Sequence, residues 1–124
     1  HVSLYQRFPS AGAVLHPHTA GSILISRLVP SVLSLSGHEL LKAFEGVTTH
    51  ETTVNVPIFP NDQNIPRLAE LIDRFIETQA DIKAYIIANH GLYTWGSTLA
   101  DALRHLEALE FMFQIETRLL GLTP

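Results

Sequence analysis

Residues 82–96 read IKAYIIANHGLYTWG, and this stretch decides the fold. The run IKAYIIA is apolar and rich in β-branched side chains, which predicts a buried strand. It leads directly into NHG, where Gly91 permits a close turn of the backbone. The following LYTW is short and extended, and Gly96 closes it. We therefore expect two strands joined by a tight turn, with His90 at the end of the first.

Helices and further strands alternate around this pair. Apolar spacing predicts helices at residues 1–8, 19–29, 38–46, 65–78 and about 98–120, and strands at 11–18, 32–35 and 54–59. Pro57 suggests that the last of these strands is an edge strand or has a bulge. The final helix has an apolar stripe of Leu99, Leu103, Leu106, Leu109, Met112 and Phe113. The alternation predicts one α/β domain over residues 1–124, with a helix-covered sheet whose strands run parallel or antiparallel.

The composition excludes several classes of function. Hydrophobic residues make up 46% of the chain and charged residues 16%, which is typical of a compact globular domain. A formal net charge of −4 argues against a nucleic-acid partner, because phosphate binding normally needs a basic excess. The absence of cysteine excludes disulfides and thiolate metal sites and favours a cytoplasmic location. No apolar run reaches membrane-spanning length, so we expect no membrane partner.

Three histidines form a candidate metal site. His16 and His18 in LHPH end a predicted strand, where residues i and i+2 point to the same side. His90 ends another predicted strand. Zinc accepts three histidines and leaves a fourth position for water or substrate, which is the catalytic pattern. On spacing alone, ordinary surface or core histidines remain an open alternative.

Other residues have less specific patterns. Glu39 in GHELLKAFEG is the candidate acid/base, because a carboxylate near a bound metal can take a carbon-bound proton. The alternative is a first-turn glutamate favoured by the helix dipole. Tyr93 and Trp95 have alternate spacing and either face a pocket or, as we favour, belong to the core. His105 is expected among solvated residues of the last helix.

The chain resembles the methylthioribulose-1-phosphate dehydratases of the class II aldolase/adducin superfamily. Five segments carry the likeness over essentially the whole chain: AVLHPHT, GHELLKAFEGVTTHE, VPIFPNDQNI, YIIANHGLYTWG and ALRHLEALEFMF. The resemblance implies a three-layer α/β/α fold with a central, largely antiparallel sheet. It also implies a homotetramer with active sites at subunit interfaces.

The resemblance further implies a zinc-dependent lyase of methionine salvage. Its reaction is the dehydration of 5-methylthioribulose 1-phosphate, a sugar phosphate, to 2,3-diketo-5-methylthiopentyl 1-phosphate. The family's zinc ligands fall on His16, His18 and His90, with one Zn²⁺ per subunit, and its general acid/base falls on Glu39. The family usually has HTH where this chain has HPH, so Pro17 keeps both ligands and removes one backbone donor.

Two other functions remain alternatives. One is an aldolase or epimerase of sugar phosphates that uses the same zinc, and the other is a non-catalytic module of the adducin type. The motif around Glu39 favours the dehydratase, and the histidines count against the module. The family has strands and Gly- and Ser-rich phosphate-binding loops ahead of the position of His1. We therefore expect a fragment, incomplete at its N-terminus, that carries the metal half of the active site.

Overall fold

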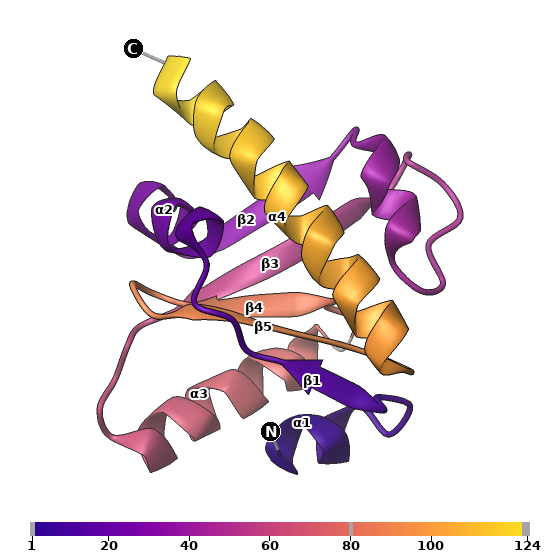
Figure 1. Cartoon of the computed structure of the whole chain (residues 1–124). Coiled ribbons are helices and arrows are strands. Elements are labelled where there is room, and N and C mark those ends of the chain that lie inside the picture. The colour runs from indigo at the N-terminus through magenta and orange to yellow at the C-terminus, as the bar shows by residue number, and fades with distance from the viewer. Residues whose placement is uncertain (1, 80, 123–124) are drawn as a thin grey trace.

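The structure is a computed structural model that describes residues 2–79 and 81–122. The described strands form one five-stranded sheet in the order β1-β5-β4-β3-β2 (Figure 1). They are β1 (Ala13–Leu15), β2 (Val32–Ser36), β3 (Thr53–Phe59), β4 (Ala84–Ile87) and β5 (Gly91–Gly96). Every neighbouring pair is antiparallel except β3 and β4, which run parallel. The expectation of an α/β fold with a largely antiparallel sheet is confirmed.

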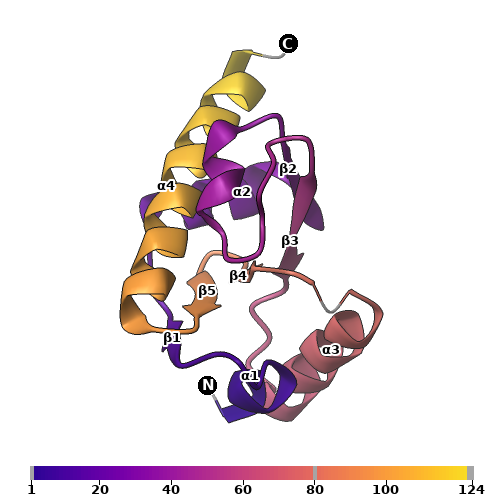
Figure 2. The ribbon, with the colours of Figure 1, turned by 90° about the vertical axis from the view of Figure 1, so that its right-hand side faces the viewer.

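Helices cover both faces of the sheet and give three layers. They are α1 (Val2–Arg7), α2 (Ala20–Leu28), α3 (Ile65–Thr78), α4 (Leu99–Leu122) and the 3₁₀ helix η1 (Glu39–Ala43). Helix α4 lies on one side of the sheet, and α1 and α3 lie on the other (Figure 2). Alternate residues of β4 face the two sides, as a pleated strand requires. Ala84 and Ile86 join the core under α2 and α4, whereas Tyr85 and Ile87 join the core under α1 and α3.

The predicted amphipathic helix at residues 65–78 is present as α3. The side chain of Asn64 caps its N-terminus by accepting a hydrogen bond from the backbone N–H of Arg67 at 3.2 Å. Leu68, Ile72 and Ile76 are buried against the sheet at helical spacing. This helix therefore follows from capping and periodicity together.

Pro57 does not mark an edge strand, because β3 lies between β2 and β4. Pro57 pairs with Val32, the first residue of β2, and the register with β4 begins one residue later, at Ile58. The N–H that Pro57 lacks is therefore at the position where pairing with β4 begins. Its absence does not interrupt the hydrogen bonds between β3 and β4.

The predicted stripe of α4 is correct only in its second half. Leu109, Met112 and Phe113 are fully buried, but Leu99 and Leu103 are 59% and 42% exposed. Ala102 and His105 take their places, and His105 is only 3% exposed. The expectation that His105 is solvated is therefore wrong, because its ring is fixed inside the protein by polar partners described below.

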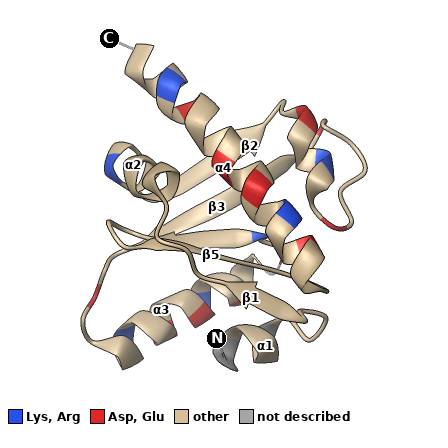
Figure 3. Cartoon of the chain, in the orientation of Figure 1, with Lys and Arg blue, Asp and Glu red and all other residues tan. Residues whose placement is uncertain are grey.

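Charged side chains are spread over the outer faces of the helices. Figure 3 shows Lys or Arg beside acidic residues on α3 and α4, whereas the only charged residue of α2 is Arg27. Among the described residues, no helix is long and apolar enough to cross a membrane.

Candidate metal centre

The three predicted metal-ligating histidines come together at one end of the sheet. His16 and His18 follow β1, which pairs with β5, and His90 lies in the turn that joins β4 to β5. That turn is tight, because Asn89 adopts a positive φ of 57° and the N–H of His90 bonds to the carbonyl of Ile87 at 3.0 Å. Residues far apart in the sequence therefore meet through strand pairing.

The ring nitrogens of the three histidines lie close together, and those of His16 and His90 are spaced as two ligands of one zinc ion are. One nitrogen from each of His16, His18 and His90 lies within 4.8 Å of the others. The Nε2 atoms of His16 and His90 are 3.3 Å apart. Two nitrogens that share a tetrahedral zinc ion at about 2.0–2.1 Å are separated by about 3.3–3.4 Å. The donor set therefore fits a small divalent cation.

The ring of His16 is held so that Nε2 points into this cluster. Its Nδ1 donates a hydrogen bond to the carbonyl oxygen of Leu92 at 2.9 Å, which leaves the Nε2 lone pair for a metal. The ring stacks on Tyr93 with centroids 3.8 Å apart. Burial lowers the pKa of His16, which favours the neutral form that a metal ligand needs. Tyr93 was expected in the core, and only its spacing beside NHG hinted at this supporting role.

The backbone of the His16–Pro17–His18 segment lies against β5. The N–H of Leu92 donates to the carbonyl oxygen of Pro17 at 3.0 Å. A side chain at Gly91 would come within 2.5 Å of that same oxygen. Glycine is therefore needed here for close approach, as the NHG motif predicts. Pro17 loses its own N–H but keeps the carbonyl that anchors the segment.

A cavity of about 290 Å³ adjoins His90. His90 and Tyr93 line one side of it, and Leu68 and Ile72 of α3 line another. A metal ion held by the histidines would therefore have room beside it for a small ligand.

Glu39, the predicted acid/base, is not part of this cluster within one chain. It begins η1 just beyond Ser36, which pairs with Thr53 at the far end of the sheet from the β4–β5 turn. Glu39 is exposed and bonds to Lys42 at 2.6 Å and to His50 at 3.2 Å. The hydrogen bond from Lys42 lowers the pKa of the Glu39 carboxyl, which favours the ionised carboxylate.

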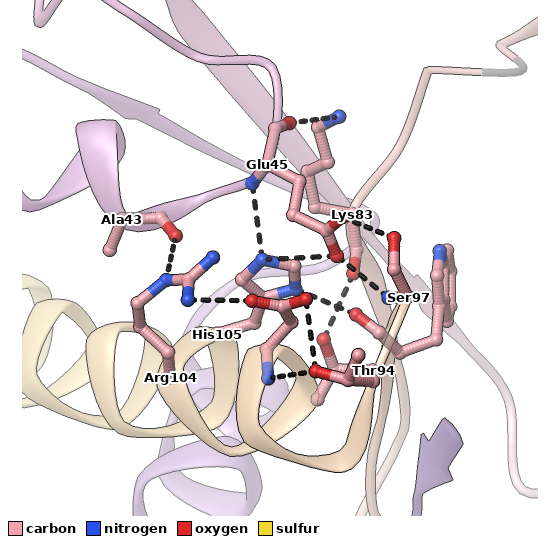
Figure 4. Close-up of polar contacts among 10 residues, drawn as sticks. Ala43, Glu45, Lys83, Thr94, Ser97, Arg104 and His105 are labelled. Carbon is pink, nitrogen blue, oxygen red and sulfur yellow. Dashed lines mark hydrogen bonds and ion pairs between the residues drawn. The ribbon is translucent and has the colours of Figure 1, made fainter. Parts of the chain in front are cut away.

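His105 belongs to a separate network at that far end of the sheet, drawn in Figure 4. Its Nδ1 donates to the carbonyl of Trp95 at 2.7 Å, and its Nε2 accepts from the backbone N–H of Glu45 at 3.1 Å. Burial lowers the pKa of His105. The Ser97 hydroxyl donates to the Glu45 carboxylate rather than to the imidazole, so no nucleophile–base pair forms. The arrangement is that of a structural histidine.

The sequence of this chain is similar to sequences of known proteins. The sequence matches the class II aldolase and adducin N-terminal domain over residues 1–117. It is 54% identical over 121 residues to the methylthioribulose-1-phosphate dehydratase of Methylococcus capsulatus, covering 98% of the chain and 59% of that protein. It is 50% identical over 124 residues to the dehydratase of the same name from Pseudomonas paraeruginosa, covering 99% of the chain and 60% of that protein.

The fold also matches solved structures. The crystal structure of YgbL from Escherichia coli superposes with a TM-score of 0.72 at 27% sequence identity, covering all of this chain and 56% of that one. The chain thus spans little more than half the length of the proteins that it matches.

Proposed function

The chain belongs to the class II aldolase and adducin family, and on that premise we propose that it carries the metal half of a methylthioribulose-1-phosphate dehydratase. The reaction would be loss of water from 5-methylthioribulose 1-phosphate, a step of methionine salvage. The proposal concerns the full-length protein, because the chain spans 59% and 60% of the two dehydratases compared with it.

The histidine cluster is the observation that carries the proposal. His16, His18 and His90 are the residues expected to hold one zinc ion per subunit, and their nitrogens lie within 4.8 Å of one another. Bound zinc would supply Lewis-acid polarisation of a substrate carbonyl. The hydrogen bond to Leu92 and the stacked Tyr93 fix the orientation of His16, so little reorganisation is needed when the ion is bound.

Glu39 is the proposed acid/base. Its ionised carboxylate would remove the proton on the carbon next to the carbonyl. It would then return that proton to the hydroxyl group that leaves the neighbouring carbon, so that the products are water and an enol that converts to the diketone. The contacts with Lys42 and His50 favour the ionised form of the carboxylate before the substrate is bound.

This role requires Glu39 to come from a neighbouring subunit. Within one chain, Glu39 and His90 lie beyond opposite ends of the sheet. A symmetric oligomer brings residues from opposite ends of two copies to one interface. We therefore propose a homotetramer in which the histidines of one subunit face Glu39 of the next.

The experiment that tests this function is a metal and activity assay of the full-length gene product. We expect one zinc ion per subunit and dehydration of methylthioribulose 1-phosphate that is lost on chelation and restored by zinc. Glu39→Gln should retain zinc and lose about 10²–10⁴-fold in kcat, the usual contribution of a positioned acid/base. Glu51→Gln is the matched control, since Glu51 is also exposed and is expected to leave activity unchanged. Full activity in Glu39→Gln or without zinc would refute the proposal.

A sister aldolase or epimerase is the second candidate, favoured by the breadth of the family that the sequence matches. The same assay separates the two functions when fuculose phosphate and ribulose phosphate are offered beside methylthioribulose phosphate. Turnover of fuculose phosphate or ribulose phosphate, without turnover of methylthioribulose phosphate, would assign the aldolase or epimerase reaction. A zinc content well below one per chain would favour a non-catalytic adducin-type module instead.

A further inference from the structure

One half-buried carboxylate, that of Glu110, takes no part in the site described above. Glu110 projects from α4 towards the N-terminus of α2, where its Oε1 accepts a hydrogen bond from the Thr19 hydroxyl at 2.5 Å. It also accepts a hydrogen bond from the backbone N–H of Gly21. Thr19 follows His18 directly and is the N-cap of α2, and Gly21 lies in the first turn of that helix. A single side chain of α4 thus bonds to the chain at the point where the His16–Pro17–His18 segment leads into α2.

Gly21 makes room for this contact. A side chain at Gly21 would come within 2.7 Å of the second carboxylate oxygen of Glu110. Thr19 is the N-cap of α2 and accepts a hydrogen bond from the N–H of Ser22 at 3.3 Å. The single proton of the Thr19 hydroxyl has two acceptors within reach, the Ser22 hydroxyl oxygen at 2.8 Å and the Glu110 carboxylate at 2.5 Å, and the carboxylate is the nearer. The cap and the carboxylate form one connected unit.

The segment that carries two of the metal ligands is consequently fixed at both ends. On one side, β5 holds it through the His16–Leu92 bond and through the bond from the Leu92 N–H to Pro17. On the other side, Glu110 holds Thr19, the residue immediately after His18. His18 itself is exposed, and its neighbour Thr19 provides the anchor to α4.

We propose that Glu110 is a positioning residue for the metal centre: it fixes the first turn of α2 and thereby the placement of His18 beside His16 and His90. The proposal rests on the proposed function, in which these histidines hold zinc. Groups that orient metal ligands typically change metal affinity by about 10–100-fold when they are removed. Glu110 differs from such groups only in acting through the backbone rather than on the imidazole.

If Glu110 had a purely structural role, its replacement would lower thermal stability and metal affinity together. Burial raises the pKa of Glu110, so the ionised carboxylate is held at a cost to folding. Replacing it with a neutral amide of the same shape removes that cost but leaves one of the two donors without an acceptor oxygen, so these opposing effects should leave thermal stability almost unchanged. A loss of metal affinity without a loss of stability is therefore the signature of positioning.

The test measures Zn²⁺ affinity of the full-length gene product by chelator competition, together with the Co²⁺ absorption spectrum and the melting temperature of the metal-free protein. Glu110→Gln and Thr19→Val should weaken Zn²⁺ binding by about 10–100-fold and alter the Co²⁺ bands. Thr19→Ser keeps the hydroxyl and should rescue most of the affinity. Glu107→Gln is the matched control, because Glu107 is exposed on the same helix and should bind Zn²⁺ as the wild type does.

The outcomes separate the two proposals. Wild-type affinity in both Glu110→Gln and Thr19→Val would overturn the positioning role and leave the metal site intact. If Glu110→Gln is unfolded at the assay temperature, the comparison of Thr19→Val with Thr19→Ser decides, and equal affinities overturn the role. A wild-type protein that binds no Zn²⁺ would refute the proposed function and this inference with it.

Discussion

The two ends of the sheet each hold buried or partly buried histidine, but they use it differently. At one end, His105 has an internal partner for each ring nitrogen, namely the Trp95 carbonyl and the Glu45 N–H. At the other end, the Nδ1 of His16 bonds to a backbone carbonyl, and its Nε2 lies 3.3 Å from another ring nitrogen, the Nε2 of His90. The difference teaches that burial alone does not distinguish a metal ligand from a structural histidine. The second nitrogen does, because a ligand must keep one lone pair for the ion.

The largest expected effect is on Zn²⁺ affinity, and it should differ between histidines at the two ends of the sheet. His90→Ala removes one of three ligands and should weaken Zn²⁺ binding by more than the ~100-fold seen when a ligand's supporting group is lost. His105→Ala should leave Zn²⁺ affinity within roughly twofold, because distant sites act independently. Chelator competition measures both values. Similar losses in the two variants would mean that the ends are not distinct.

The next effect concerns the acid/base at the far end. His90→Ala and Glu39→Gln are each expected to inactivate the full-length protein, but a mixed oligomer of the two should regain activity. If subunits pair at random, about a quarter of the interfacial sites combine intact histidines with an intact Glu39. Denaturing, mixing and refolding the two variants, followed by activity measurement, tests this. No recovery in an oligomer shown to be mixed would place Glu39 and the histidines of one chain in the same site.

A smaller effect is expected on stability. His105→Ala leaves a cavity and two unpaired backbone groups, which should lower the free energy of unfolding by about 2–4 kcal/mol. His50→Ala, at an exposed position, should change it by no more than about 0.5 kcal/mol. Urea unfolding of the metal-free protein gives both numbers. Equal stability of the two variants would show that the network in Figure 4 contributes nothing.

The smallest expected effect is a pH dependence of stability that is caused by His105. Burial holds the pKa of His105 below its ordinary value of 6.5, and Glu45, Asp101 and Arg104 are the charged groups that act on it. Above about pH 6.5 the imidazole is neutral in both folded and unfolded protein, so its contribution is fully present. As the pH falls below that value, the unfolded chain takes up a proton that the folded protein excludes, and stability decreases.

Unfolding of the metal-free protein at about pH 7.5 and 5.5 measures this loss. His105→Gln cannot titrate and should lose less stability over that interval than the wild type. His16 also has a lowered pKa, so part of the decrease should remain in the variant. An unchanged decrease in His105→Gln would contradict the assignment to His105.

Sequence patterns predicted the sheet and its helices well, because strand and helix periodicity reflect burial directly. The β4–β5 pair and the NHG turn follow from local residues alone. The burial of His105 did not follow, because it depends on partners contributed by other segments, such as the N–H of Glu45. On α4, Leu99 and Leu103 fit helical spacing as well as Ala102 and His105 do, and only tertiary packing decides between them.

The candidate site, too, could be predicted only in part from the sequence. Spacing places His16, His18 and His90 at strand ends, but no spacing rule reveals that Glu110 reaches Thr19 across 91 residues. Nor does any local pattern tell that Glu39 begins its helix at the opposite end of the sheet. Such relations come from topology, which a sequence encodes only through its complete fold.

The most direct test of the central claim, that these histidines form one metal site, is a crystal structure of the zinc-loaded full-length protein with anomalous diffraction at the zinc edge. The account predicts a single ion per subunit, with nitrogens of His16, His18 and His90 at about 2.0–2.1 Å. An ion held elsewhere, or three histidines that bind none in the presence of excess zinc, would contradict it.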